Sequence, residues 1–411
     1  MLICVGLGFA SGLPLFLLVQ LVPAWLRLEG VSLTAIGFFT AIQYPYSLKF
    51  LWSPAVERYS IAWLGRRRGW MLLTQVLLIL SISVLGVWQP ADALLAITLI
   101  AILIAIFSAT QDIVIDAYRR ELLVTDGELA LGNTVHVQAY RLAGLIPGSL
   151  GMILAGFMAW EWVFPIMAAF MAVGIILTLS IREAQTEPLI PGSLKAAITE
   201  PFREFFARRG YRAAVAVLAF MFLYKLGDNM ATALATPFYI DMGFSTTQIG
   251  LIAKNAALWP SIIGGVLGGL MIVKIGINRG LWVFGVVQLA TIFGFVWLSE
   301  MGAVPWVLAV VIGAEYLGVG LGTAASVAFI ARETAKTAVA TQLALFTALA
   351  ALPRVLASSV SGLIVDSIGW TQFFYLCAIL AVPGMVLLYW VAPFNAPVGS
   401  QAPKDSDQSL A

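Results

Sequence analysis

The chain has 411 residues, of which 61% are hydrophobic and 11% are charged, whereas an ordinary soluble domain has about 25% charged residues. A soluble core stops growing at about 250–300 residues, so this composition excludes a water-soluble globular protein. The net charge is +2, with two cysteines and one histidine. These counts give no indication of nucleic-acid binding, a disulfide framework or a metal site, and we expect no cofactor.

The first predicted element is an apolar run that begins at Met1. It lacks a charged leader and a small-residue cleavage site, so we interpret it as a membrane-spanning helix and not as a signal peptide. A helix needs about 20 mostly apolar residues to cross the hydrocarbon layer. Charged, Pro and Gly positions divide the chain into twelve such runs, at approximately 2–24, 33–52, 70–89, 93–117, 134–158, 161–181, 213–239, 246–272, 281–299, 304–330, 341–365 and 371–393.

The connections between these runs alternate in charge. The loops after the odd-numbered runs contain one basic residue, Arg27. The loops after the even-numbered runs and the tail contain Arg58, Arg66, Arg67, Arg68, Arg119, Arg120, Arg182, Lys195, Arg203, Arg208, Arg209, Arg212, Lys274, Arg279, Arg332, Lys336 and Lys404. Because cytoplasmic loops are enriched in Lys and Arg, we expect the even loops and both chain termini to be cytoplasmic.

The longest loop divides the runs into six and six. We expect an N-terminal half at 1–181, a cytoplasmic linker at 182–212, a C-terminal half at 213–393 and a disordered cytoplasmic tail at 394–411. The linker stretch 193–209 mixes phenylalanines with arginines, which is typical of a helix lying on a membrane surface.

An internal repeat supports the division into halves. Segment 30–37 recurs 213 positions later as segment 243–250, with five of the eight positions identical. Six runs separate the two copies, an even number, so both copies cross the membrane in the same direction. Such parallel repeats resemble the two halves of the major facilitator superfamily.

The loop after the second run strengthens this resemblance. It contains Ser53-x-x-x-Glu57-Arg58 and then Gly65-Arg66-Arg67-Arg68, which is similar to the superfamily loop Gly-x-x-x-Asp-Arg-x-Gly-Arg-Arg. The loop after the eighth run has a degenerate copy, Gly269-x-x-x-Val273-Lys274-x-Gly276. The match at two equivalent loops predicts an all-α polytopic membrane protein of the major facilitator fold, with twelve transmembrane helices in two parallel six-helix repeats. The resemblance implies gating roles for Glu57, Arg58 and Lys274.

Ionisable residues remain inside the predicted spans, at Lys49, Asp112, Asp116, Arg141, Lys225, Asp228, Lys254, Glu315 and Arg354. Each costs about 2.5–3.5 kcal/mol at the bilayer centre on insertion scales, so these side chains must form ion pairs or line water. Lys225 and Asp228 are three residues apart and share a helix face. They are either a cavity-lining pair or a purely structural one.

The acidic residues are candidates for proton coupling, at Asp112, Asp228 and Glu315. We expect Asp112 to face the cavity and Asp116 to act in gating by pairing with Arg58 or Arg119. Glu315 lies deepest in its span, and two interpretations stay open. It is either a proton site, because burial favours the neutral form of a carboxyl group, or the partner of Arg354, which we also count among the gating residues.

Helix irregularities indicate a binding site near the middle of the membrane. At the repeat offset Lys225, which lies beside Gly227 and Asn229, corresponds to Gly12, which lies beside Pro14, so both repeats have a helix irregularity at similar depth. The motif Gly144-x-x-Pro147-Gly148-x-x-Gly151 indicates either close helix packing or similarity to drug/proton antiporters. The candidate substrate-binding residues are Gly12, Gln43, Gln111, Asp112, Gln138, Tyr140, Arg141, Lys225, Asp228, Asn229, Lys254 and Asn255.

Several strings resemble the muropeptide permease (AmpG) family of the major facilitator superfamily. They are 49–54 (KFLWSP), 109–114 (ATQDIV) with Asp116-Ala117, 140–142 (YRL), 223–228 (LYKLGD), 322–325 (GTAA) and 340–342 (ATQ). The strings extend from the second to the eleventh predicted run, so the resemblance covers essentially the whole chain. Two departures leave the cargo open: some family members have two more spans, and Arg119-Arg120-Glu121 is more charged than expected.

The resemblance implies a proton-driven symporter, and not an enzyme, in the bacterial cytoplasmic membrane. Its expected cargo is N-acetylglucosaminyl-1,6-anhydro-N-acetylmuramic acid with or without peptide, and its expected partners are this small molecule, protons and membrane lipid, without nucleic acid. We expect a monomer. The intramembrane charges named above are five basic against four acidic, which leaves a cation for a substrate carboxylate. The alternative is a facilitator-type transporter of another cargo, by acyl-coenzyme A exchange or drug/proton antiport.

Overall fold

A computed structural model describes residues 1–59, 61, 65–123, 126–183, 203–333 and 339–395. Most of these residues are helical, with one isolated β-bridge between Ile61 and Gly65 and no strand among the described residues. Of the expected linker helix at 193–209, residues 203–209 are described and are helical. The rest of that stretch, and nearly all of the expected tail, lie outside the described residues.

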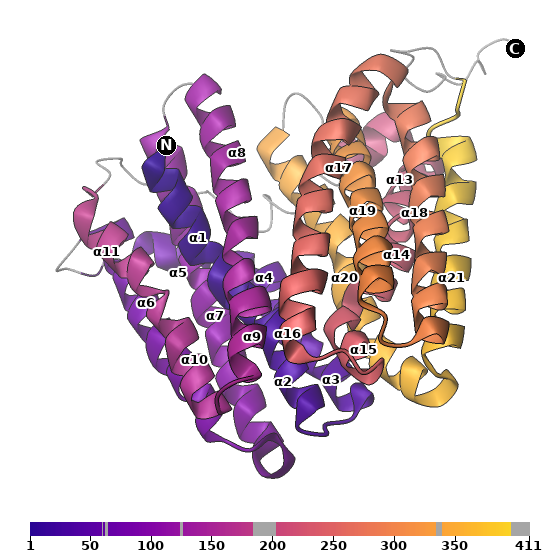
Figure 1. Cartoon of the computed structure of the whole chain (residues 1–411). Helices are drawn as coiled ribbons and strands as arrows, with labels where there is room; N and C mark the ends of the chain where they lie inside the picture. The colour runs from indigo at the N-terminus through magenta and orange to yellow at the C-terminus, as the bar shows by residue number, and fades with distance from the viewer. Residues whose placement is uncertain (60, 62–64, 124–125, 184–202, 334–338, 396–411) are drawn as a thin grey trace, which may run out of the picture.

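The helices form two groups that stand beside each other (Figure 1). The first group contains α1 (Leu2–Phe16), α2 (Val22–Leu28), α3 (Leu33–Phe39), α4 (Tyr44–Leu48), α5 (Ser53–Arg58), α6 (Arg66–Ser83), α7 (Pro90–Leu122), α8 (Asp126–Ala143), α9 (Gly151–Ala155), α10 (Trp160–Ala169) and α11 (Ala172–Ser180). The second group contains α13 (Tyr211–Leu223), α14 (Leu226–Ala233), α15 (Ala235–Asp241), α16 (Thr246–Gln248), α17 (Lys254–Ile275), α18 (Ile277–Met301), α19 (Pro305–Glu333), α20 (Val339–Ile368) and α21 (Trp370–Val391).

Nine helical segments of the described chain are long and apolar enough to cross a membrane. They are Leu2–Leu28, Arg66–Val87, Pro90–Arg119, Trp160–Ser180, Tyr211–Asp241, Thr246–Ile275, Ile277–Met301, Pro305–Glu333 and Trp370–Val391, and each coincides with a predicted span. The other predicted spans, 33–52, 134–158 and 341–365, also coincide with helical segments, which are not among these nine. The all-α membrane fold is confirmed, and the full count of twelve crossings stays a prediction.

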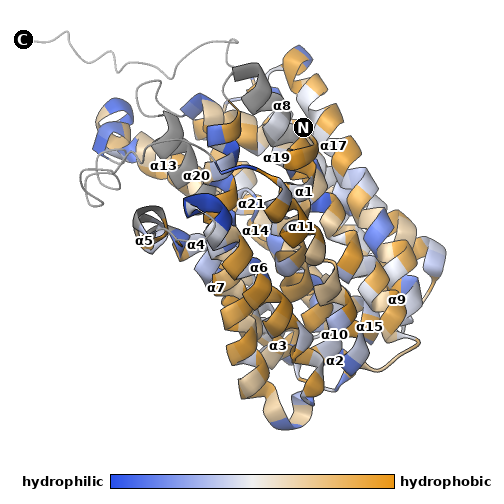
Figure 2. Cartoon of the chain, turned by 90° about the vertical axis from the view of Figure 1, so that its left-hand side faces the viewer, coloured by the Kyte–Doolittle hydropathy of each residue, from blue (hydrophilic) through white to orange (hydrophobic). Residues whose placement is uncertain are grey.

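Apolar residues make up much of the length of the helices (Figure 2). Leu80, Leu95 and Val273 are examples of large hydrophobic residues that are mostly exposed. Such faces are unfavourable in water and favourable in lipid, where a helix satisfies its own backbone hydrogen bonds. The structure therefore has the surface of an integral membrane protein.

Several of the membrane-crossing segments are interrupted helices. The predicted span 33–52 is divided by 3₁₀ turns at Thr40–Gln43 and Lys49–Leu51, close to Pro45, which lacks a backbone N–H group for a continuous helix. Three π-helical turns occur elsewhere, at Leu17–Leu21, Ile146–Leu150 and Ile249–Ala253. Such turns are rare and often lie at functional sites.

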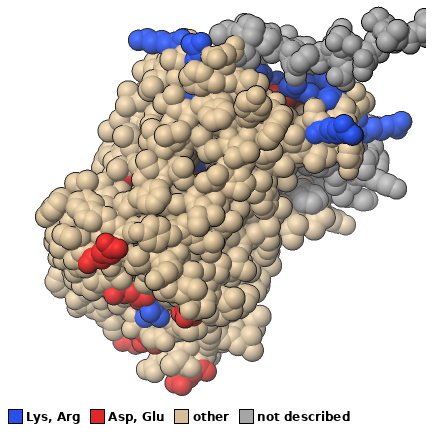
Figure 3. All heavy atoms as spheres, turned by 90° about the vertical axis from the view of Figure 1, so that its right-hand side faces the viewer, with Lys and Arg blue, Asp and Glu red and all other residues tan. Residues whose placement is uncertain are grey.

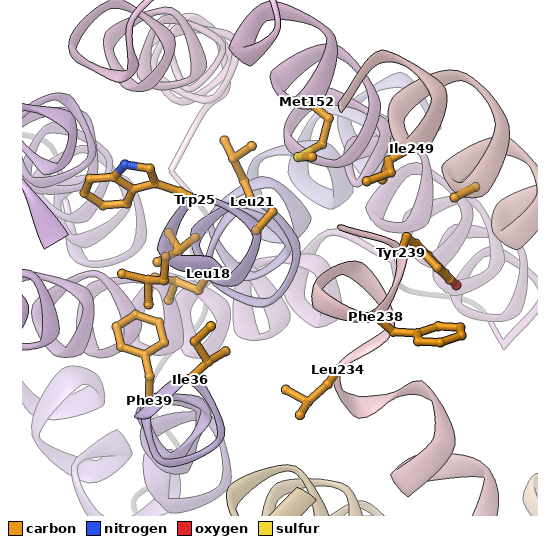
Figure 4. Packing of buried hydrophobic residues seen from close by; sticks show 14 of the residues in the cluster. Leu18, Leu21, Trp25, Ile36, Phe39, Met152, Leu234, Phe238, Tyr239 and Ile249 are labelled. Carbon is orange, nitrogen blue, oxygen red and sulfur yellow. The ribbon is translucent and has the colours of Figure 1, made fainter. Parts of the chain in front are cut away.

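The two groups pack together at the end of the molecule where α2 and α15 end, which we call the Trp25 end. There α2, α3 and α9 contact α15, α16 and α20, and one apolar cluster joins residues of both groups, such as Trp25, Met152, Phe238 and Ile249 (Figure 4). At the other end, which we call the Met1 end, each group has its own separate apolar cluster. The groups are therefore joined tightly at one end of the molecule.

Candidate functional site

A cavity of about 270 Å³ lies between the two groups. Residues of both groups line it, among them Gln20 and Gln43 from the first group and Thr236, Lys254 and Tyr316 from the second. Pockets at the boundary between helix bundles are frequent ligand sites. Any relative movement of the two groups changes the shape of this cavity.

The cavity has a cationic lining. Arg141 from α8, Lys254 from α17 and Arg354 from α20 line it, and no acidic residue does so among the described lining residues. The Lys254 Nζ atom donates a hydrogen bond to Thr236 Oγ1 at 2.7 Å. Arg141 and Arg354 have no side-chain hydrogen bond or ion pair within the described chain. A cavity lined by one sign of charge attracts ligands of the opposite sign, so this cavity favours an anion.

The three π-helical turns meet beside this cavity. Gln20 lies in the first turn, Gly148 lies in the second, and the third turn ends immediately before Lys254. A Cβ atom at Gly148 would lie 2.0 Å from Gln20 Oε1 and 3.4 Å from Lys254 Cδ. Because Gly148 has no side chain, these two polar side chains fit next to α9 and the cavity.

A second cluster of charged residues lies deeper inside the second group. Lys225 Nζ forms an ion pair with Asp228 Oδ2 at 2.7 Å and donates a hydrogen bond to Gln288 Oε1 at 2.9 Å. Glu315 of α19 also belongs to this cluster. Glu315 is 1% exposed, and Asp228 is 4% exposed. None of these four residues lines the cavity. We call them the Lys225 cluster; the structure confirms the ion pair but places it beside the cavity.

The first group contains a charge cluster nearer to the Met1 end. Lys49 Nζ lies 3.9 Å from a carboxylate oxygen of Asp112 and 3.9 Å from one of Asp116. Asp112 also accepts a hydrogen bond from Ser11 at 2.5 Å, and Asp116 pairs with Arg119 at 3.0 Å. Two cations thus face two carboxylates, so this cluster is balanced in charge.

Polar contacts join the two groups at the Trp25 end. Arg27 at the end of α2 binds both carboxylate oxygens of Asp241 at the end of α15, at 2.6 and 2.8 Å. Trp370 Nε1 donates to the same carboxylate at 2.9 Å. Near the start of α3, Thr34 donates from its backbone and its hydroxyl to Asp366 at 2.8 and 2.6 Å. We call these five residues the Trp25-end gate.

The structure distributes the predicted site residues over several places. Gln43, Arg141 and Lys254 line the cavity, and so does Arg354, which was predicted to act in gating. Gly12 does not line the cavity. It packs against the backbone of α8, where a Cβ atom at Gly12 would lie 2.4 Å from the Tyr140 carbonyl oxygen. Glu315 and Arg354 form no ion pair within the described chain.

The remaining predicted residues do not line the cavity. Gln111 Nε2 donates to the Ala10 carbonyl and Asn255 Nδ2 to the Leu251 carbonyl, both at 2.9 Å. Gln138, Tyr140 and Asn229 are half-buried, and Lys274 is exposed. The side chains of Glu57 and Arg58 lie outside the described residues. The functional roles assigned to all these residues stay predictions.

Sequence reasoning missed several polar residues of the cavity, which are Gln20, Thr40, Thr232, Thr236, Ser261, Tyr316, Thr323 and Ser358. Gln20 could have been found, because it is the one amide side chain of the first predicted span and an amide in lipid needs a polar neighbour. The hydroxyl residues gave no such signal, since Ser and Thr can bond to their own helix backbone.

Comparisons with known proteins identify the family. The chain matches the family model of the Major Facilitator Superfamily over residues 4–327. It is 50% identical to an uncharacterized protein of Haemophilus influenzae over 407 residues, 96% of this chain and 95% of that protein. It is 38% identical to the anhydromuropeptide permease of Escherichia coli over 384 residues, 93% of this chain and 77% of the permease. Its fold is similar to the crystal structure of the nucleoside transporter NupG, with a TM-score of 0.73 at 12% identity, over 96% of this chain and 98% of that chain.

The named relatives are transporters and not enzymes, as the sequence predicts. Together with the apolar spans, they show an integral inner-membrane protein that transports a small molecule. The family match covers most of the chain and the identity to the permease exceeds what fold similarity alone produces. The chain belongs to the anhydromuropeptide permease (AmpG) family of the major facilitator superfamily.

Proposed function

We propose that the protein imports peptidoglycan fragments into the cytoplasm together with protons. The cargo is N-acetylglucosaminyl-1,6-anhydro-N-acetylmuramic acid, with or without peptide, in keeping with the name of the Escherichia coli relative, an anhydromuropeptide permease. The observation that supports this cargo is the cationic lining of the cavity, with Arg141, Lys254 and Arg354 and no acidic residue among the described lining residues.

The charge and the polar groups of the cargo suit this lining. The lactyl group of the peptide-free disaccharide has a carboxylate, and in the form with peptide the carboxylates belong to the peptide. A guanidinium group binds a carboxylate through two parallel hydrogen bonds. The sugar hydroxyl and acetamido groups need neutral donors and acceptors, which Gln20 and Gln43 can supply from the first group and Tyr316 from the second. A cationic drug would meet repulsion from three like charges, which argues against drug/proton antiport.

We propose further that 1–181 and 213–393 act as two halves that rock about the cavity, joined by the linker 182–212. On the face shown in Figure 3, Lys and Arg gather at the upper end, which is the Met1 end, and Asp and Glu at the lower end. This distribution favours a cytoplasmic Met1 end and cytoplasmic termini. The tight packing at the Trp25 end then supports an inward-facing state, closed toward the periplasm.

Uptake into proteoliposomes tests this function. We expect the reconstituted protein to accumulate radiolabelled anhydro-disaccharide when the pH outside is lower than inside, and a protonophore to stop accumulation. An analogue with the lactyl carboxylate converted to an amide should compete poorly, because it lacks the charge that the cavity favours. Competition by an acyl-coenzyme A instead of the disaccharide would assign another anionic cargo, and sodium-dependent uptake that is insensitive to the protonophore would contradict proton coupling.

A further inference from the structure

Glu315 is a buried carboxylate whose nearest polar neighbours are Asp228 and Thr291. It lies in the middle of α19 and is 1% exposed, and neither of its carboxylate oxygens accepts a hydrogen bond within the described chain. The Oδ1 atom of Asp228 is also buried without a partner there. An unpaired ionised carboxylate in an apolar interior is very unfavourable, and such groups take up a proton instead.

The groups that face Glu315 come from four neighbouring elements. They are Lys225 and Asp228 beside the start of α14, Tyr239 of α15, Thr291 of α18 and Cys377 of α21. Lys225 is the one basic residue among them. Two ionised carboxylates would thus face one ammonium group, which leaves one negative charge uncompensated in a buried site. One added proton makes the site neutral.

We infer that Asp228 and Glu315 share one proton and form the proton-binding site of the transport cycle, with Lys225 as their fixed counter-ion. This inference rests on the proposed proton-coupled function and names the site that performs the coupling. In the loaded state one carboxyl group is neutral and the other pairs with Lys225. Release of the proton leaves a net negative charge, which only a change of conformation or the entry of water can stabilise.

Two helical segments connect this site to the cavity and to the gate. The segment α14–α15 contains Asp228, then Thr232 and Thr236 of the cavity lining, and ends at Asp241 of the Trp25-end gate. On α19, Glu315 is followed directly by Tyr316, which lines the cavity. A proton that changes how Asp228 lies against Glu315 therefore acts on two segments that contain residues of the cavity lining and of the gate.

The other buried carboxylate of the predicted set, Asp112, is a weaker candidate. Its side chain accepts a hydrogen bond from Ser11 and lies near Lys49, and Asp116 beside it pairs with Arg119. Two cations lie near two carboxylates there, whereas the Lys225 cluster has one cation for two carboxylates. We therefore expect this cluster to retain its charges while the Lys225 cluster exchanges a proton.

Transport by neutral variants tests the assignment. Glu315→Gln and Asp228→Asn each leave one carboxylate paired with Lys225 and so imitate the proton-loaded site. Both variants should lose proton-driven accumulation of the radiolabelled anhydro-disaccharide completely, yet retain counterflow, the exchange of labelled for unlabelled cargo without net proton movement. Glu300→Gln, which removes an exposed carboxylate at the end of α18, is the matched control and should accumulate cargo like the wild type. Wild-type accumulation by either site variant would overturn the inference.

A measurement without cargo separates the two proposals. Infrared difference spectroscopy of the protein in lipid, recorded during a pH titration, should show the band of a protonated carboxyl group in an apolar environment. The band should disappear in Glu315→Gln and in Asp228→Asn and remain in Glu300→Gln. If the wild type shows this band but does not take up the disaccharide, the cargo assignment fails and the proton site stands. If the band is absent in the wild type, or persists in both site variants, the proton site fails.

Discussion

Arg27 and Asp241 form a bidentate ion pair across the boundary between the two groups of helices, with Nε–Oδ1 and Nη2–Oδ2 distances of 2.6 and 2.8 Å. The two residues are 214 positions apart, almost the 213-residue offset of the internal repeat. They therefore end corresponding helices of the two repeats, and these helix ends approach each other at the Trp25 end. The side chains are 26% and 15% exposed, so water weakens the pair only in part.

The first prediction concerns this gate. Asp241→Asn removes the charge that Arg27 and Trp370 bind, and hydrogen bonds to charged groups contribute about 1.5–3 kcal/mol. We expect the equilibrium between the states closed and open at the Trp25 end to shift roughly 10- to 100-fold toward the open state. A cysteine introduced at Ala235, which lines the cavity, should then react faster with a membrane-impermeant thiol reagent added from the periplasmic side.

The matched control for the gate is the exposed ion pair of Arg208 with Glu204. Glu204→Gln should leave the labelling rate unchanged, because exposed pairs of this kind contribute little. The double variant with Asp at position 27 and Arg at position 241, which exchanges the two charges, should have a labelling rate close to that of the wild type. Equal labelling of Asp241→Asn and the wild type would show that the pair does not hold the gate closed.

The second prediction concerns the cavity cations. Replacing Arg141 or Arg354 by Gln removes a charged partner for a substrate carboxylate, and such a bond contributes about 1.5–3 kcal/mol. We expect the KM of disaccharide uptake to rise roughly 10- to 100-fold, with a smaller effect on the amide analogue that lacks the lactyl carboxylate. Arg212→Gln, at an exposed position outside the cavity, should leave the KM unchanged. An equal loss for acid and amide cargo would show that these arginines act on packing and not on charge.

The arrangement of spans could be predicted from the sequence because lipid imposes a simple rule. A segment must be apolar over about 20 residues to cross, so hydrophobic runs such as 281–299 and 371–393 coincide with the long helices α18 and α21. The run 33–52 satisfied the same rule but forms a helix broken at two turns. Such breaks cannot be predicted from composition, because neighbouring helices satisfy the backbone groups that a broken helix leaves unpaired.

The candidate site was predictable only in its chemistry. The spacing of Lys225 and Asp228 predicted their ion pair correctly, because residues three apart on a helix face the same side. Spacing does not determine what that side faces, which depends on the rotation of α14 against α18, α20 and α21. In the sequence, Arg27 was noted only as the one basic residue in the loops after the odd-numbered runs. Its ion-pair partner Asp241 lies in the other repeat. Contacts between distant segments are set by tertiary packing, which a local sequence pattern does not reveal.

The third prediction compares two glycines of close helix contacts. A Cβ atom at Gly12 would lie 2.4 Å from the carbonyl oxygen of Tyr140. The backbone of Tyr140 cannot move aside without separating α1 from α8. A Cβ atom at Gly148 would meet the end of the Gln20 side chain at 2.0 Å, which can rotate toward the cavity. We expect Gly12→Ala to destabilise the protein by about 1–3 kcal/mol in a thermal unfolding assay. Gly148→Ala should unfold like the wild type but transport with a raised KM, and the reverse pattern would contradict this assignment.

The last prediction separates the two members of the Lys225–Asp228 pair. Lys225→Ala leaves Asp228 and Glu315 without a cation in a buried site, and breaking a buried pair costs about 3–5 kcal/mol; it should abolish proton-driven uptake and lower thermal stability. Asp228→Ala leaves Lys225 facing Glu315, so it should abolish proton-driven uptake with a smaller loss of stability. A merely structural pair should recover uptake when both charges are removed, and we expect the double variant to show no recovery. Thermal unfolding and uptake at matched expression decide the matter, and substantial uptake by the double variant would show that the pair serves only to hold the helix in place.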